Sequence, residues 1–266
     1  MKLKLQAITK MHINLFQPIN PKSIILFRIC LALMLAYMFA PRGLTPIYPL
    51  SEFPNLNQYL FSDSYYILIY VLIAIFALGI KSQILSVLLF LILLPHDFLS
   101  SGRTSKQVIL CVLFCFAFIR TLPIWKINQI THKISDYSPI WPIRLIQIQL
   151  SLLYGVNALA KTTYSYLSGD VLIEMSKNLK NYHIDVSDGF LHVLDISIPA
   201  YLLAITSVFV EYFLAFGFWF KKAKWIAFFI GLIFHFSLTF VLTIFMLDYV
   251  SVFLYLAFII PFKLKK

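Results

Sequence analysis

The chain has 266 residues, of which 61% are hydrophobic and 12% are charged, and its mean hydropathy is +0.85. A soluble domain is about half apolar and about a quarter charged, so this composition excludes an ordinary water-soluble protein and indicates an integral membrane protein in a lipid bilayer. The net charge of +11 does not indicate a nucleic-acid partner, because the distribution of basic residues follows membrane topology.

Apolar runs of nearly membrane-spanning length recur along the chain. Residues 1–22 are basic and are interpreted as a cytoplasmic lead-in at the membrane surface. A spanning helix needs about 20 apolar residues. Eight segments approach this length, and we expect helices at 23–40, 64–80, 83–100, 106–123, 142–160, 198–219, 225–243 and 246–262. The first is interpreted as an uncleaved span, not a signal peptide.

The charges between these segments predict the topology. Both ends of the chain and the 124–141 connection are basic, whereas nearly all acidic residues fall in the alternate loops. This positive-inside bias predicts an even number of spans with the N- and C-termini in the cytoplasm. The longest outer segment is then 161–197. We therefore expect one all-α domain over 1–266, a polytopic membrane helix bundle of about eight transmembrane helices.

The segment 141–170 contains the most informative pattern. Polar and small residues recur there at helical spacing, on one face: Gln147, Ser151, Tyr154, Ala158 and Lys161. Such a stripe suits a helix that lines a polar cavity, which we expect to open outward. Lys161 ends the helix at the outer boundary, where a lysine can simply reach water. Alternatively, partial burial would favour a neutral amine that acts as a base.

Among the ionisable residues inside the other predicted spans, three stand out, namely Arg28, Glu211 and His235. Glu211 and His235 are expected at similar depth on adjacent helices and therefore to pair, with Arg28 as a third member. Thr239 lies one helical turn after His235. Two interpretations stay open, a structural ion pair and a proton relay or cofactor contact, because intramembrane charges are costly and often functional.

No metal site is expected from the sequence. Cys30, Cys111 and Cys115 lie in apolar runs, where cysteine usually packs as a small hydrophobic residue. The His96–Asp97 pair at a helix end lacks further ligands, so a helix-end hydrogen bond is the favoured interpretation.

Several segments together resemble a known family. They are the opening NLFQPINPKSIILFRICLALML with Arg28, the run YYILIYVLIAIFALGIKSQILSVLLFL, the segment from Trp141 with Gln149, Tyr154, Lys161 and Gly169, and the later Glu211 and Phe234–His235. On these segments the chain resembles the HTTM family, the membrane domain shared with vitamin K-dependent γ-glutamyl carboxylases. In size it is similar to short bacterial members of the sporulation-delaying protein B type.

The resemblance implies a catalytic group of Lys161 as base, Tyr154 as its orienting residue, and Glu211 and His235 as residues that tune the site or relay protons. Further cavity-lining residues would be Gln147, Gln149, Ser151, Arg28 and Thr239. The implied cofactor or substrate is a quinone or vitamin K-like hydroquinone. The implied location is a bacterial inner membrane, and the implied partner is a small secreted peptide precursor.

The chain also departs from the carboxylases. Tyr166 stands where the family has tryptophan, one family histidine has no counterpart, and no segment corresponds to the large lumenal domain. Carboxylation of protein glutamates is therefore not expected. Three functions stay open: modification of a secreted peptide or of a quinone, non-enzymatic assembly or export of a peptide, and transport of a small solute. Transport ranks last because no repeated halves are evident.

Overall fold

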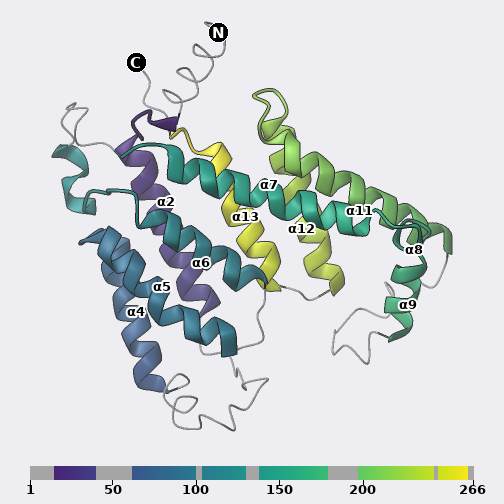
Figure 1. Ribbon diagram of the computed structural model, residues 1–266, viewed down its shortest axis with the longest axis horizontal. Helices are drawn as coiled ribbons and strands as arrows, with labels where there is room; N and C mark the ends of the chain where they lie inside the picture. Colours follow the sequence, from purple (N-terminus) through teal and green to yellow (C-terminus); the bar gives the residue numbers. More distant parts are fainter. Residues whose placement is uncertain are drawn as a thin grey trace, which may run out of the picture. The chain divides into compact units, whose positions relative to one another are not determined.

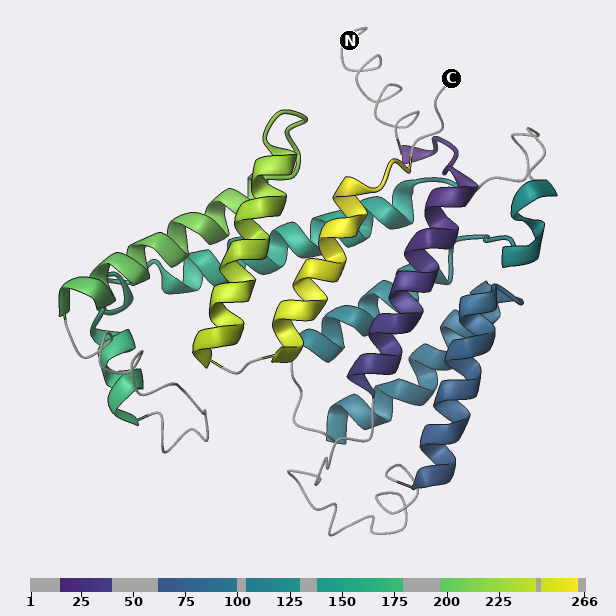
Figure 2. The same ribbon diagram turned by 180° about the vertical axis from the view of Figure 1, so that it is seen from behind.

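The computed structural model describes residues 15–39, 62–99, 104–129, 138–178, 197–242 and 245–262. Within these ranges the chain is helical and has no strand, only an isolated bridge between Pro18 and Pro139 (Figures 1 and 2). The all-α class predicted from the sequence is confirmed. Most of the predicted lead-in and outer loops, at 1–14, 40–61 and 179–196, lies outside the described residues.

Each of the eight apolar segments forms a helix. These helices are α2 (Pro21–Met38), α4 (Asp63–Leu78), α5 (Ser82–Leu99), α6 (Thr104–Phe116), α7 (Trp141–Lys161), α11 (Ser197–Gly217), α12 (Lys224–Leu242) and α13 (Phe245–Ile259). The connections contain α8 (Tyr164–Leu167), α9 (Asp170–Asn178) and the 3-10 helix η1 (Ile124–Gln129).

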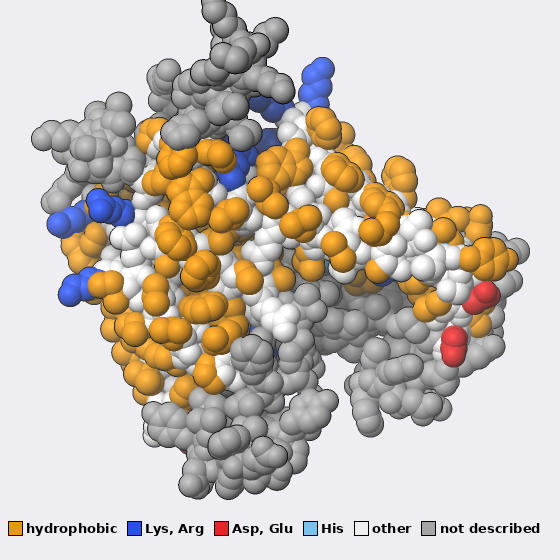
Figure 3. All heavy atoms as spheres, in the orientation of Figure 1, with side chains coloured by type: hydrophobic (Ala, Val, Ile, Leu, Met, Phe, Trp, Pro, Cys, Tyr) orange, Lys and Arg blue, Asp and Glu red, His pale blue; other side chains and the backbone are white. Residues whose placement is uncertain are grey.

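Three of these helices are long and apolar enough to cross a membrane within the described residues: Pro21–Met38, Trp141–Lys161 and Pro199–Gly217. The other apolar helices are shorter there. Hydrophobic side chains cover much of the face drawn in Figure 3, as lipid contact requires. These features are compatible with membrane association, and the full eight-span topology is taken up below as a proposal.

The helix α6 ends earlier than the predicted segment 106–123. It stops at Phe116, and the chain continues as a turn and an extended stretch to Pro123. A residue that precedes proline disfavours the helical conformation, so Leu122 cannot continue the helix easily. The freed carbonyl of Leu122 and the hydroxyl of Thr121 both accept hydrogen bonds from Arg28.

Contacts divide the chain into two compact units, which are described separately. Unit 1 comprises residues 1–146 and 260–266, and unit 2 comprises Gln147–Ile259. In unit 1, α2, α4, α5 and α6 pack around stacked and edge-on rings of Phe27, Phe76 and Phe116. The α4–α5 hairpin turns at Gly79, which caps α4 in the left-handed conformation (φ 86°).

In unit 2, α12 and α13 lie side by side, and α7 runs antiparallel to α11 (Figures 1 and 2). The contacts run in opposite directions along the two segments: Ser151 of α7 meets Trp219 just after α11, Lys161 meets Glu211, and Tyr166 of α8 meets Ser207. The last residue of α7 therefore lies beside the middle of α11. The 14 residues from Ser197 to Glu211 extend about 21 Å past the end of α7, where α8 and α9 pack.

Gly169 holds this packing in place, and its replacement by alanine should destabilise the protein. Its φ is +86°, and a Cβ there would lie 2.7 Å from the backbone nitrogen of Tyr201. We expect Gly169→Ala to lower the free energy of unfolding by about 2 kcal/mol or more, from left-handed strain and the backbone clash together. Thermal unfolding of the purified protein in detergent measures this change.

The matched control is Gly155→Ala within α7. A Cβ on Gly155 would meet only the Cβ of Ala215, at an ordinary distance of 3.9 Å. Alanine favours a helix over glycine by about 0.5–1 kcal/mol, so this change should leave the stability equal or slightly higher. Equal midpoints for the two variants would contradict the close α9–α11 packing.

Candidate functional site

The polar stripe of α7 faces the interior of unit 2. Gln147, Tyr154 and Ala158 are at most 7% exposed, whereas Leu152 and Leu159 on the opposite face are more than 60% exposed. The helical spacing thus predicted the buried face correctly. Gln149 is half-buried and lies two residues from Gln147, so it points away from the stripe.

The stripe residues bind other helices of unit 2. The side-chain nitrogen of Gln147 donates to the carbonyl of Ala257 at 2.7 Å, and the indole nitrogen of Trp219 donates to the Ser151 hydroxyl at 2.7 Å. These hydrogen bonds connect α7 to α13 and to the turn after α11. The sequence predicted a cavity wall here, and the structure shows a hydrogen-bonded seam between helices.

Tyr154 is the centre of a buried network. Its hydroxyl lies 2.5 Å from Nε2 of His235 on α12 and 2.6 Å from the hydroxyl of Tyr255 on α13. All three side chains are at most 4% exposed. Because a hydroxyl both donates and accepts, Tyr154 can donate to one neighbour and accept from the other, which gives a continuous path for a proton.

Gly231 makes this arrangement possible. It lies one turn before His235 on α12, and a Cβ there would be 2.5 Å from the hydroxyl of Tyr255. Only a residue without a side chain therefore lets α13 approach α12 closely enough for Tyr255 to reach Tyr154.

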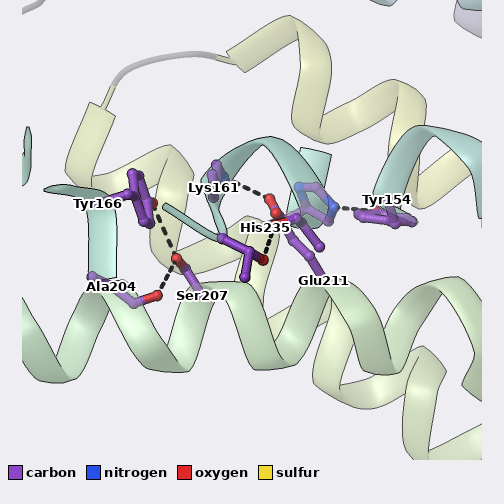
Figure 4. Close-up of polar contacts among 9 residues, drawn as sticks. Tyr154, Lys161, Tyr166, Ala204, Ser207, Glu211 and His235 are labelled. Atoms are coloured by element: carbon purple, nitrogen blue, oxygen red, sulfur yellow. Dashed lines mark hydrogen bonds and ion pairs between the residues drawn. The ribbon is translucent and has the colours of Figure 1, made fainter. Parts of the chain in front are cut away.

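Lys161 and Glu211 form an ion pair at the end of α7, with Nζ 2.7 Å from Oε1 (Figure 4). The lysine side chain is 33% exposed and the glutamate side chain 6%. The second carboxylate oxygen, Oε2 of Glu211, is buried and has no hydrogen-bond partner. Glu211 is thus half-satisfied, next to a cation that water can still reach.

A second layer of contacts holds Lys161. Its Nζ lies 5.7 Å from the ring centroid of Tyr166, close enough for a cation–π interaction. The hydroxyl of Tyr166 lies 3.1 Å from the hydroxyl of Ser207, which donates to the carbonyl of Ala204 at 2.9 Å (Figure 4). The loop after α7 is therefore tied to α11 on both sides of the ion pair.

Glu211 pairs with Lys161, a contact that the sequence did not predict, whereas the expected partner of Glu211 was His235. One carboxylate oxygen of Glu211 binds Lys161, the other has no hydrogen-bond partner, and Nε2 of His235 binds Tyr154. The sequence placed Lys161 at the outer boundary and Glu211 inside a span, so no contact between them was expected. The offset between the two helices brings them together instead.

Arg28 lies in unit 1 and has its partners there. It is fully buried. Its Nε donates to the carbonyl of Ala77 at 3.3 Å, and its Nη1 donates to the carbonyl of Leu122 at 2.9 Å and to the hydroxyl of Thr121. Its Nη2 has no hydrogen-bond partner.

Some functional candidates were missed by sequence reasoning, and others are not described. Tyr255, Trp219 and Ser207 were not singled out, although a hydroxyl or indole nitrogen inside an apolar run needs a partner and could have signalled the first two. The side chains of His96, Asp97 and Thr239 lie outside the described part of the structure.

Comparison of the chain with protein-family models, with curated proteins and with solved structures gives no match.

Proposed function

We propose that the protein is a polytopic membrane protein whose unit 2 carries an acid–base site for a lipid-soluble hydroquinone, with Lys161 as the base. The observation that carries this proposal is the half-satisfied carboxylate of Glu211. A buried carboxylate oxygen without a hydrogen bond is costly in apolar surroundings. It suits a site in which a substrate hydroxyl supplies the missing hydrogen bond.

The ion pair can act as a unit. Glu211 lies 2.7 Å from Nζ of Lys161, so its carboxylate can accept the ammonium proton and leave a neutral amine. That amine can then take the proton from a phenolic hydroxyl. Tyr166 presents an aromatic face beside Nζ, which suits stacking against a flat quinone-type ring.

The Tyr154 network is assigned a supporting role. The hydrogen-bonded chain from Tyr255 through Tyr154 to His235 would position or exchange a proton deeper in the helix bundle. The resemblance to the HTTM family supports quinone chemistry, and the basic loops support a bacterial inner membrane with eight spans and both termini in the cytoplasm.

The proposal is tested by replacing Lys161 in protein reconstituted in lipid nanodiscs. The probe is a short-chain vitamin K hydroquinone, and its oxygen-dependent consumption is followed by absorbance. We expect turnover by the wild type and a loss of about 10²–10⁴-fold in Lys161→Ala, the usual contribution of a general base. Lys161→Arg keeps the charge but cannot lose its proton, so it should be equally inactive.

Undiminished turnover by a well-folded Lys161→Ala protein would contradict the catalytic role. So would full activity in Lys161→Arg, because a cation alone would then suffice.

A non-enzymatic role in assembly or export of a small secreted peptide is the second candidate. It is favoured by the hydrogen bonds of Gln147, Ser151 and Tyr154 to other helices, because such a seam also serves as structural support. On this alternative, a tagged protein should capture the same peptide precursor with or without Lys161→Ala, and it should not consume the hydroquinone.

A further inference from the structure

Arg28 is a buried cation without a carboxylate partner. Its side chain has no solvent exposure, and its hydrogen bonds go to two carbonyls and one hydroxyl. Among the described side chains of unit 1, the acidic residue is Asp63. It begins α4, 14 residues before Ala77, and thus lies about 21 Å away along the helix.

The carbonyls compensate this charge only in part. Ala77 belongs to the last turn of α4 and contributes the partial negative charge of a helix C-terminal end, whereas Leu122 lies in the extended stretch after α6 and supplies an ordinary peptide carbonyl. A guanidinium has five N–H donors in a planar fork. The two on Nη2 have no acceptor, which leaves one side of the fork open for an anion with several oxygens.

Nη2 lies directly beneath the α4–α5 turn. A Cβ on Gly79 would be 2.5 Å from Nη2, and the next residues, Ile80 and Lys81, are exposed. Lys81 adopts φ 43°, in the left-handed region that a residue with a side chain rarely occupies. A shift of this short exposed turn would uncover Nη2 for a ligand.

The surface at this end of unit 1 is basic. Exposed basic residues lie near these helix ends, namely Lys22 at the start of α2, Lys81 after α4, Arg120 after α6 and Lys126 in η1. They would attract an anion to the turn.

We propose that Arg28 binds a phosphate group at this end of unit 1, supplied by an anionic phospholipid headgroup or by free phosphate. The two N–H groups of Nη2 would donate to phosphate oxygens, and Lys81 would contribute a second positive charge. This site is independent of the chemistry proposed for unit 2.

The test measures the thermal unfolding midpoint of the full chain in detergent. Phosphatidylglycerol forms one arm, inorganic phosphate the second, and phosphatidylcholine and chloride are the controls. We expect one of the first two arms to raise the midpoint by about 5 °C at saturation, and which arm does so identifies the source of the phosphate. Arg28→Lys keeps the charge but not the fork, and should abolish the increase.

The double variant Lys22→Gln, Lys126→Gln is the control for surface charge, and it should keep at least half of the increase. No increase in either wild-type arm would overturn the proposal. An undiminished increase in Arg28→Lys, or its complete loss in the double variant, would also overturn it.

A direct measurement covers the case in which Arg28→Lys does not fold. The other four arginines, Arg42, Arg103, Arg120 and Arg144, are replaced by lysine, so that Arg28 is the sole arginine of the chain. Nitrogen-15 in its guanidinium should then show dipolar coupling to the phosphorus of the bound phosphate in solid-state NMR. Absence of that coupling in protein saturated with both probes would overturn the proposal.

Discussion

Replacing Lys161 by methionine is expected to lower the free energy of unfolding by about 3 kcal/mol, because it leaves the carboxylate of Glu211 buried without its counter-ion. Glu211 is 6% exposed and its Oε2 already has no hydrogen-bond partner. Breaking a buried ion pair usually costs about 3–5 kcal/mol. We expect the low end of this range, because the lysine side chain is 33% exposed and water can reach the carboxylate from its side. Reversible denaturation in mixed micelles measures the change.

Replacement of the partner residue, Glu211, should lower the free energy of unfolding by less. In Glu211→Leu the remaining ammonium of Lys161 can turn towards water, as long lysine side chains do at membrane boundaries. We expect a loss of about 1 kcal/mol, close to the value of a partly exposed pair. The asymmetry between the two single variants is the specific signature of a pair with one buried and one accessible member.

The double variant Lys161→Met, Glu211→Leu separates the energy of the ion pair from the other contributions of the two side chains to stability. If the ion pair exists, this variant should be more stable than Lys161→Met alone, because it removes the orphaned carboxylate. The double-mutant cycle should give a coupling energy of about 1–3 kcal/mol. Strict additivity of the two single effects would show that Lys161 and Glu211 do not interact in the folded protein.

The positions of the helices could be predicted from the sequence because each depends on a local property, a long apolar run. Where the prediction was wrong, a non-local contact was responsible. The helix before Pro123 ends at Phe116 instead of 123, and the stretch after it supplies Thr121 and Leu122 to Arg28 on a distant helix. No residue pattern within that segment indicates that Arg28 will be its hydrogen-bond partner.

In the candidate site, too, the sequence predicted local features but not the contacts between helices. The spacing of Gln147, Tyr154 and Ala158 predicted which face of α7 is buried, since one helix alone determines that face. The choice of partners depends on the offset between helices. Glu211 binds Lys161 because Gly155 packs near Ala215 and the loop after α7 is tied to α11, and these contacts are visible only in the folded chain.

Removal of the Tyr154 hydroxyl should have the second largest effect. In Tyr154→Phe, both His235 and Tyr255 lose the hydrogen bond that Tyr154 supplies in a buried place. We expect a loss of about 2–3 kcal/mol in the free energy of unfolding, because a lost bond to a buried polar group costs more than the bond's net contribution. Tyr255→Phe removes only one of the two bonds and should cost about 1 kcal/mol.

Tyr212→Phe is the matched control for these variants. Its hydroxyl lies 3.1 Å from the hydroxyl of Thr162 in an exposed contact, where water can replace the lost partner, so the stability should change by less than about 0.5 kcal/mol. Equal effects of Tyr154→Phe and Tyr212→Phe would contradict a buried network. If the network also serves the proposed proton transfer, Tyr154→Phe should reduce hydroquinone turnover more than Tyr255→Phe, because the Tyr154 hydroxyl binds both His235 and Tyr255.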